Sequence, residues 1–161
     1  MDALLIIDLQ NGVNSEMFPL YQLDSLLNAV NDRIADYRLH DKPIIFVQHN
    51  DDDNLIKGSD AWALFSELNH QENDYYVDKT HANSFYHTEL KSVLDKLHIT
   101  GLEICGAQTE YCVDATIKMA HALDYSVTVF SGLTTTNDAG LFLAADKIAH
   151  YEAIWKGRFA K

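Results

Sequence analysis

The chain of 161 residues is long enough to bury a hydrophobic core without disulfide bonds or a structural metal, and we expect one domain over residues 1–161. Its 12 basic and 24 acidic residues give a formal net charge of −12, which argues against nucleic acid and against an anionic membrane surface as partners. The two cysteines lack metal-ligand spacing, and the first apolar run is too short for a signal or a membrane span, so a cytoplasmic location is expected.

The elements expected from the sequence alternate between strands and helices. A continuous apolar run is typical of a strand buried on both faces of a parallel sheet, and apolar residues three and four positions apart are typical of a helix that covers it. In chain order we expect a strand over 3–7, a helix over 21–39, a strand over 43–47, a short helix capped by Ser59, a strand over 74–77, a helix between Phe85 and Leu97, a strand over 103–107, a helix that starts at Cys112, a strand over 126–130 and a helix over 139–149 with Leu141 facing inward.

Strands that alternate with helices predict an α/β fold with a parallel sheet. We expect a three-layer α/β/α arrangement around a mostly parallel, Rossmann-like sheet in the order 3-2-1-4-5, with a sixth strand left open because the segment after Trp155 is short. The turn after the first strand reads Asp-Leu-Gln-Asn-Gly, and neither the dinucleotide-binding nor the phosphate-binding glycine motif occurs. No cofactor is therefore expected.

Cys112 lies where the fourth predicted strand passes into a helix. The unpaired N–H groups and the positive dipole end of a helix start favour a thiolate over a thiol, and a thiolate at a strand end is a candidate nucleophile. The alternative is an inert, small apolar residue, which is our interpretation of Cys105 inside the strand. A disulfide between the two cysteines is not expected, because their Cβ vectors would not meet.

Two further polar residues follow strands at the same edge of the predicted sheet. Asp8 comes directly after the first strand, and Lys79 comes after the third. The first and fourth strands are neighbours at the point where the strand order reverses, so Asp8 and Cys112 should share a crevice. The third strand lies further out, and only a long lysine side chain that turns inward would reach that crevice. The alternative for Asp8 is a turn or helix-capping residue.

Three motifs are distributed along the chain between Leu4 and Thr116. They read Leu4-Leu5-Ile6-Ile7-Asp8-Leu9-Gln10, then Asp78-Lys79 followed by Asn83-Ser84-Phe85 and Thr88-x-Leu90, and then Gly106-Ala107-Gln108-Thr109-Glu110-Tyr111-Cys112-Val113 with Ala115-Thr116. In this order they make the chain similar to the isochorismatase-like cysteine hydrolases, the superfamily of nicotinamidases and N-carbamoyl amidohydrolases.

The resemblance implies a mechanism. Asp8 would take the proton of Cys112, Lys79 would stabilise the negative charges, and the thiolate would attack an amide-like carbonyl to form a thioester that water releases. The backbone N–H groups of Gln108 and Cys112 would form the oxyanion hole, with a cis peptide bond between Ala107 and Gln108. The expected protein is a homo-oligomeric hydrolase that cleaves a C–N bond of a small amide or N-carbamoyl substrate.

The sequence indicates the residues that line the substrate pocket less directly than it indicates the catalytic residues. Gln10, Trp62, Phe85 and Tyr111 are candidates for them. The alternative for Gln10 is a residue that braces the loop around Asp8, or a surface glutamine. Aromatic residues at the spacings of Trp62 and Phe85 are equally typical of the core.

A metal site is not expected. Nicotinamidases bind a metal beside the cleft through an Asp-x-His pair and a further His, whereas this chain offers His49, Asp51 and Asp53 without the His after the acidic residue. His49, His81 and His87 have no assigned role. Two alternatives stay open: a catalytically silent member of the superfamily that acts as a binding or assembly protein, and a metal-assisted nicotinamidase.

Overall fold

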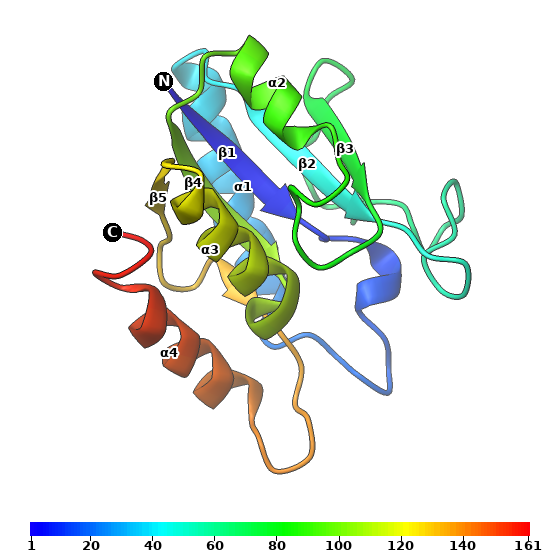
Figure 1. Ribbon diagram of the computed structural model, residues 1–161. Helices are drawn as coiled ribbons and strands as arrows, with labels where there is room; N and C mark the ends of the chain where they lie inside the picture. The colour runs from blue at the N-terminus through cyan, green and yellow to red at the C-terminus, as the bar shows by residue number, and fades with distance from the viewer.

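The computed structural model describes residues 1–161 and contains a six-stranded parallel sheet in the order β3-β2-β1-β4-β5, with β6 beside β4 (Figure 1). The expected fold class and strand order are confirmed. None of the helices has the length and apolar content that a membrane span requires. The strands are β1 (Asp2–Ile7), β2 (Ile44–His49), β3 (Tyr75–Lys79), β4 (Gly101–Ala107), β5 (Ser126–Thr128) and β6 (Thr134–Thr135), and the α-helices are α1 (Leu23–Leu39), α2 (Leu90–Lys96), α3 (Asp114–Ala122) and α4 (Ala144–Trp155).

Helices cover both faces of the sheet because the side chains of each central strand alternate between two cores. Ala3, Leu5 and Ile7 of β1 pack with α2, α3 and the end of α4, whereas Leu4 and Ile6 pack with α1. All five side chains are inaccessible to solvent. Figure 1 shows α1 behind the sheet and α2 and α3 in front of it, which is the expected three-layer arrangement.

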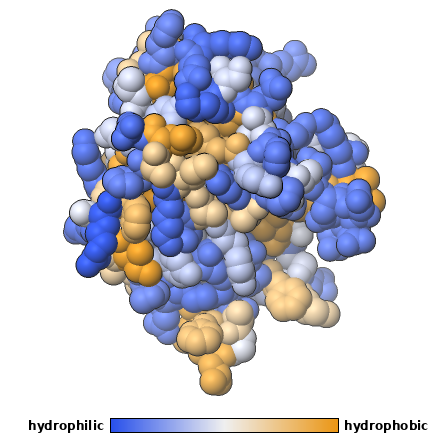
Figure 2. Space-filling view, viewed as in Figure 1, coloured by the Kyte–Doolittle hydropathy of each residue, from blue (hydrophilic) through white to orange (hydrophobic).

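The last helix does not lie where the sequence pattern placed it. It was expected over 139–149, but α4 begins at Ala144, whose N–H donates to Asp138 Oδ1 at 2.7 Å. An antiparallel bridge between Ala139 and Phe142 forms a tight turn before it, and Leu141 is 97% exposed rather than inward-facing. Figure 2 shows apolar side chains protruding at the lower end of the molecule, where Figure 1 places this loop.

Two other expected elements also differ from the structure. Ser59 caps a turn and not a helix, because its Oγ accepts from the Trp62 N–H at 3.2 Å. After this turn, Leu64 forms an isolated antiparallel bridge with Gln10. The sixth strand is Thr134–Thr135, which pairs with the end of β4, and not the segment after Trp155. Both differences arise from long-range pairing, which local sequence patterns do not encode.

Gly106 of β4 pairs in register with Ile7 of β1. Its φ is +126°, and a Cβ at this position would lie 2.1 Å from the carbonyl oxygen of Ile7. We expect Gly106→Ala to lower the free energy of unfolding by at least about 2 kcal/mol. The energetic cost of a positive φ in alanine adds to the cost of a steric clash with the backbone of β1. Gly132→Ala is the matched control, since Gly132 has φ +82° but no atom within 4 Å of an added Cβ. Equal losses in chemical denaturation of the two variants would contradict this explanation.

Candidate active site

The structure brings Asp8, Lys79 and Cys112 together at the carboxyl edge of the sheet. Asp8 follows β1 with a φ of +51°, and its N–H donates to the Val47 carbonyl of β2 at 2.9 Å. Lys79 is the last residue of β3, and its side chain extends across the end of β2. Its Nζ lies 2.7 Å from Asp8 Oδ2 and 3.2 Å from Cys112 Sγ. The ammonium group therefore lies between the carboxylate and the thiol.

Asp8 and Lys79 form an almost completely buried ion pair, with exposed fractions of 3% and 2%. Lys79 Nζ also contacts His49 Nδ1 at 3.0 Å and the His81 carbonyl at 3.1 Å, so protein acceptors occupy its N–H groups. Asp8 Oδ1 is buried and has no hydrogen-bond partner. This free carboxylate oxygen is available to accept a proton from a neighbouring acid.

The surroundings of Cys112 oppose ionisation of its thiol. Burial and the Asp8 carboxylate raise the pKa of Cys112 to about 12, against the lowering effect of the Lys79 ammonium. The sequence pattern predicts that the helix starts at Cys112, and the structure corrects this start. Cys112 belongs to a π-helical turn, Thr109–Val113, and α3 begins only at Asp114. A thiol in these surroundings becomes a nucleophile only when a base takes its proton.

The turn that carries Cys112 has an unusual backbone. The peptide bond between Ala107 and Gln108 is cis. The carbonyl of Gln108 accepts from the N–H groups of Tyr111 at 3.1 Å and Val113 at 3.2 Å, while the Gln108 N–H has no acceptor within the protein. A free backbone N–H four residues before the thiol is the type of donor that stabilises an oxyanion. The π-helical geometry of the turn is also frequent at functional sites.

Contacts from distant elements hold this turn in place, and sequence reasoning missed them. Glu110 forms an ion pair with Lys147 of α4 at 2.5 Å, with both side chains largely buried. On the other side, Thr116 of α3 accepts from the Ser84 N–H at 3.1 Å and donates to Ser84 Oγ at 2.9 Å. The only signal in the sequence was that the Ser84 and Thr116 segments both belong to the recognised motifs; nothing marked Lys147.

Gln10 braces the loop around Asp8 and is neither a surface residue nor a wall of an open pocket. It is inaccessible to solvent. Its Nε2 donates to the carbonyls of His49 at 2.9 Å and Trp62 at 2.8 Å, and its Oε1 accepts from the His49 N–H at 2.8 Å. One side chain thus joins the ends of β1 and β2 to the turn that follows Ser59.

The three aromatic candidates for the pocket have different surroundings. Phe85 stacks on Tyr125 with ring centroids 5.9 Å apart and packs against the core beneath α2 and α3, so it belongs to the core. Tyr111 is 57% exposed beside Cys112 in the π-helical turn. Trp62 is half-buried, and Lys57 Nζ lies 5.9 Å from its ring centroid. Tyr111 and Trp62 remain candidates for contact with a substrate.

The acidic loop after β2 does not assemble a set of metal ligands. The structure has no group of three or more His, Cys, Asp or Glu side chains placed to bind one metal ion. Asp51 Oδ1 accepts the backbone N–H groups of Asp53, Asn54 and Leu55, and His49 Nδ1 faces the Lys79 ammonium. The side chains of His49 and Asp51 thus have roles within the protein and no third ligand lies beside them, so the residues do not fit the metal site of a nicotinamidase.

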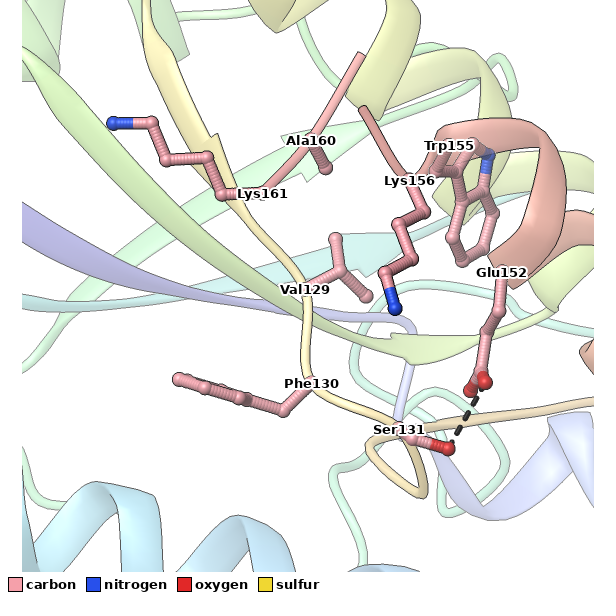
Figure 3. A pocket seen from close by; sticks show the side chains of 8 residues that line it. All are labelled: Val129, Phe130, Ser131, Glu152, Trp155, Lys156, Ala160 and Lys161. Atoms are coloured by element: carbon pink, nitrogen blue, oxygen red, sulfur yellow. Dashed lines mark hydrogen bonds between the residues drawn. The ribbon is translucent and has the colours of Figure 1, made fainter. Parts of the chain in front are cut away.

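A cavity of about 330 Å³ does not include Cys112 in its lining (Figure 3). Its walls come from the segment after β5, the end of α4 and the C-terminal segment, and Ser131 Oγ donates to Glu152 at 2.9 Å on one side. None of the residues predicted for the site lines it; the lining residues are Val129, Phe130, Ser131, Glu152, Trp155, Lys156, Ala160 and Lys161. The reactive groups, and not this cavity, therefore define the candidate active site.

Comparisons with known proteins agree on one family. A family model described as the isochorismatase domain matches residues 2–150. A crystal structure of an isochorismatase family protein is 49% identical to this chain, with a TM-score of 0.98 over 99% of this chain and 96% of that one. An isochorismatase hydrolase from Oleispira antarctica is 30% identical, with a TM-score of 0.91 over 99% and 91% of the two chains.

Relatives with named activities match over shorter stretches. The streptothricin hydrolase of Streptomyces noursei is 25% identical over 79% of this chain and 47% of its own length. The ureidoacrylate amidohydrolase RutB of Agrobacterium fabrum is 35% identical over 44% of this chain and 31% of its own length. A nicotinamidase of Arabidopsis thaliana that is named as inactive is 39% identical over 50% and 42% of the two chains.

Proposed function

This chain belongs to the isochorismatase family of hydrolases, and from that premise we propose that it is a cysteine-dependent hydrolase that cleaves the C–N bond of a small amide or N-carbamoyl compound. The observation that carries the proposal is the position of Lys79 Nζ, 2.7 Å from Asp8 and 3.2 Å from Cys112 Sγ. A nucleophile, a base and a cation in contact supply the groups that covalent amide hydrolysis needs.

In the first half of the proposed reaction, Asp8 takes the proton of the Cys112 thiol as Sγ attacks the carbonyl carbon. The Lys79 ammonium stabilises the thiolate as it forms, and the Gln108 N–H donates to the oxyanion. Collapse of the tetrahedral adduct breaks the C–N bond, and the proton held by Asp8 goes to the departing ammonia or amine. A thioester on Cys112 remains.

In the second half, Asp8 takes a proton from water, and the resulting hydroxide attacks the thioester carbonyl. The C–S bond breaks, the acid or carbamate is released, and the proton returns to Cys112. Every proton stays within the substrate, one water molecule and these side chains. The two named hydrolases among the relatives support this class of reaction.

The main alternative is a catalytically silent family member, and one relative is named as an inactive nicotinamidase. The contact of all three reactive groups favours the enzyme, since a binding protein has no need of an almost completely buried lysine against a carboxylate and a thiol. The metal-assisted nicotinamidase is not supported, because the acidic loop does not assemble the ligands.

An ammonia-release assay tests the proposal. The panel comprises N-carbamoylglycine, N-carbamoylsarcosine, ureidoacrylate, nicotinamide and simple aliphatic amides. Iodoacetamide should abolish release from the active compounds in proportion to the alkylation of Cys112, measured by peptide mass spectrometry. Cys105 serves as the internal control, because it is inaccessible to solvent and burial raises the pKa of its thiol further. Equal, slow labelling of both cysteines without ammonia release would favour the silent protein.

A further inference from the structure

His49 is the last residue of β2 and lies between the strands that carry Asp8 and Lys79. It pairs in register with Lys79, and its Nδ1 lies 3.0 Å from Lys79 Nζ. Gln10 fixes its backbone from both sides, since the amide of Gln10 donates to the His49 carbonyl and accepts from the His49 N–H. The position of the ring is therefore set by the same residue that braces the loop after Asp8.

The contact with Lys79 determines the tautomer of this ring. An ammonium group can only donate, so Nδ1 must accept, and the proton of a neutral imidazole must then lie on Nε2. Burial and the adjacent Lys79 ammonium lower the pKa of His49, which keeps the ring neutral near pH 7. Nε2 makes no hydrogen bond within the protein, and His49 as a residue is only partly buried. The cluster thus leaves one side-chain N–H donor without a partner in the protein.

We propose that His49 binds the substrate: Nδ1 orients the Lys79 ammonium, and the Nε2–H donates to a second acceptor oxygen that lies next to the amide to be cleaved. The proposal rests on the proposed function and narrows its substrate class. The substrate would be an amide or N-carbamoyl compound with a carboxylate or second carbonyl close to the scissile bond.

Lys79 itself is not suited to this role. Its Nζ contacts Asp8 Oδ2, His49 Nδ1, the His81 carbonyl and the thiol, which uses all three of its protons. A substrate oxygen would have to displace one of these partners. The Nε2–H of His49 can bind a substrate oxygen without displacing a protein partner. The contact of Nδ1 with Lys79 already orients the ring before the substrate binds.

Two substitutions test the roles of the two ring nitrogens of His49 separately. His49→Asn keeps an acceptor oxygen near the position of Nδ1 but removes the outer donor, and His49→Gln places an amide N–H near the position of Nε2 but removes the acceptor for Lys79. We expect His49→Asn to raise KM about five- to tenfold with kcat nearly unchanged, and His49→Gln to lower kcat with KM nearly unchanged. His121→Asn, on α3 and away from the cluster, is the matched histidine control.

The measurement uses the most active compound of the ammonia-release panel that carries a second acceptor oxygen. A wild-type KM in His49→Asn, or the same loss pattern in both variants, would overturn the proposal. Protection of Cys112 from iodoacetamide by N-carbamoylglycine gives a second readout that needs no turnover: weaker protection in His49→Asn than in His49→Gln supports the donor, and equal protection contradicts it. Absence of ammonia release from every compound would instead count against the proposed function.

Discussion

Cys112→Ala is expected to abolish C–N bond hydrolysis, with kcat/KM lower by on the order of 10⁴-fold or more. Without Sγ no thioester can form, and the Asp8–Lys79 ion pair that remains contains no nucleophile. The fold should tolerate the change, because Cys112 is only partly buried and alanine fits the π-helical turn. Ammonia release and thermal unfolding on the same preparation measure the two properties separately.

Cys105→Ala is the matched control for this variant. Cys105 is inaccessible to solvent inside β4 and faces the core beneath α1, so its loss should reduce stability without removing activity. Hydrolysis that survives in Cys112→Ala, or that disappears in a folded Cys105→Ala, would be incompatible with Cys112 as the nucleophile.

The second large effect is expected from Asp8→Asn, which should lower kcat by about 10²- to 10⁴-fold through the loss of the general base. The same change should make the thiol more acidic. The Asp8 carboxylate is one of the causes that raise the pKa of Cys112 to about 12, and Lys79 lowers it. Removal of the negative charge therefore shifts the pH dependence of Cys112 alkylation to lower pH. A protein with a more readily ionised thiol and much less hydrolysis would identify Asp8 as a proton acceptor.

Hydrolysis that is retained or enhanced in Asp8→Asn would show that the carboxylate only tunes the charge of the site. Asp78→Asn is the control, because Asp78 lies next to Lys79 in β3 but its exposed carboxylate pairs with Lys57 at the surface. Circular dichroism should accompany both assays, since Asp8→Asn leaves the Lys79 ammonium buried without its partner and destabilises the fold.

The reactive residues and the sheet order could be predicted from the sequence, because both depend on patterns that are local in the chain. Apolar runs such as 3–7 mark central strands, alternation with helices predicts a parallel sheet, and a sheet wound outward from the first strand has the order 3-2-1-4-5. Asp8, Lys79 and Cys112 each follow or end such a run, so the fold class places them at one edge. The resemblance of the motifs supplied their expected roles.

Only the tertiary structure decided the state and surroundings of the site. The protonation of Cys112 depends on burial and on the charge of Asp8, which no sequence neighbour of Cys112 reveals. The contacts of Lys79 with His49 and of Glu110 with Lys147 join residues 30 and 37 positions apart, and the start of α4 depends on Asp138. The sequence by itself thus determined the fold class and the strand ends near which Asp8, Lys79 and Cys112 lie. Tertiary packing determined the burial and the partners of these groups, because electrostatic and hydrogen-bond energies depend on distance in space and not along the chain.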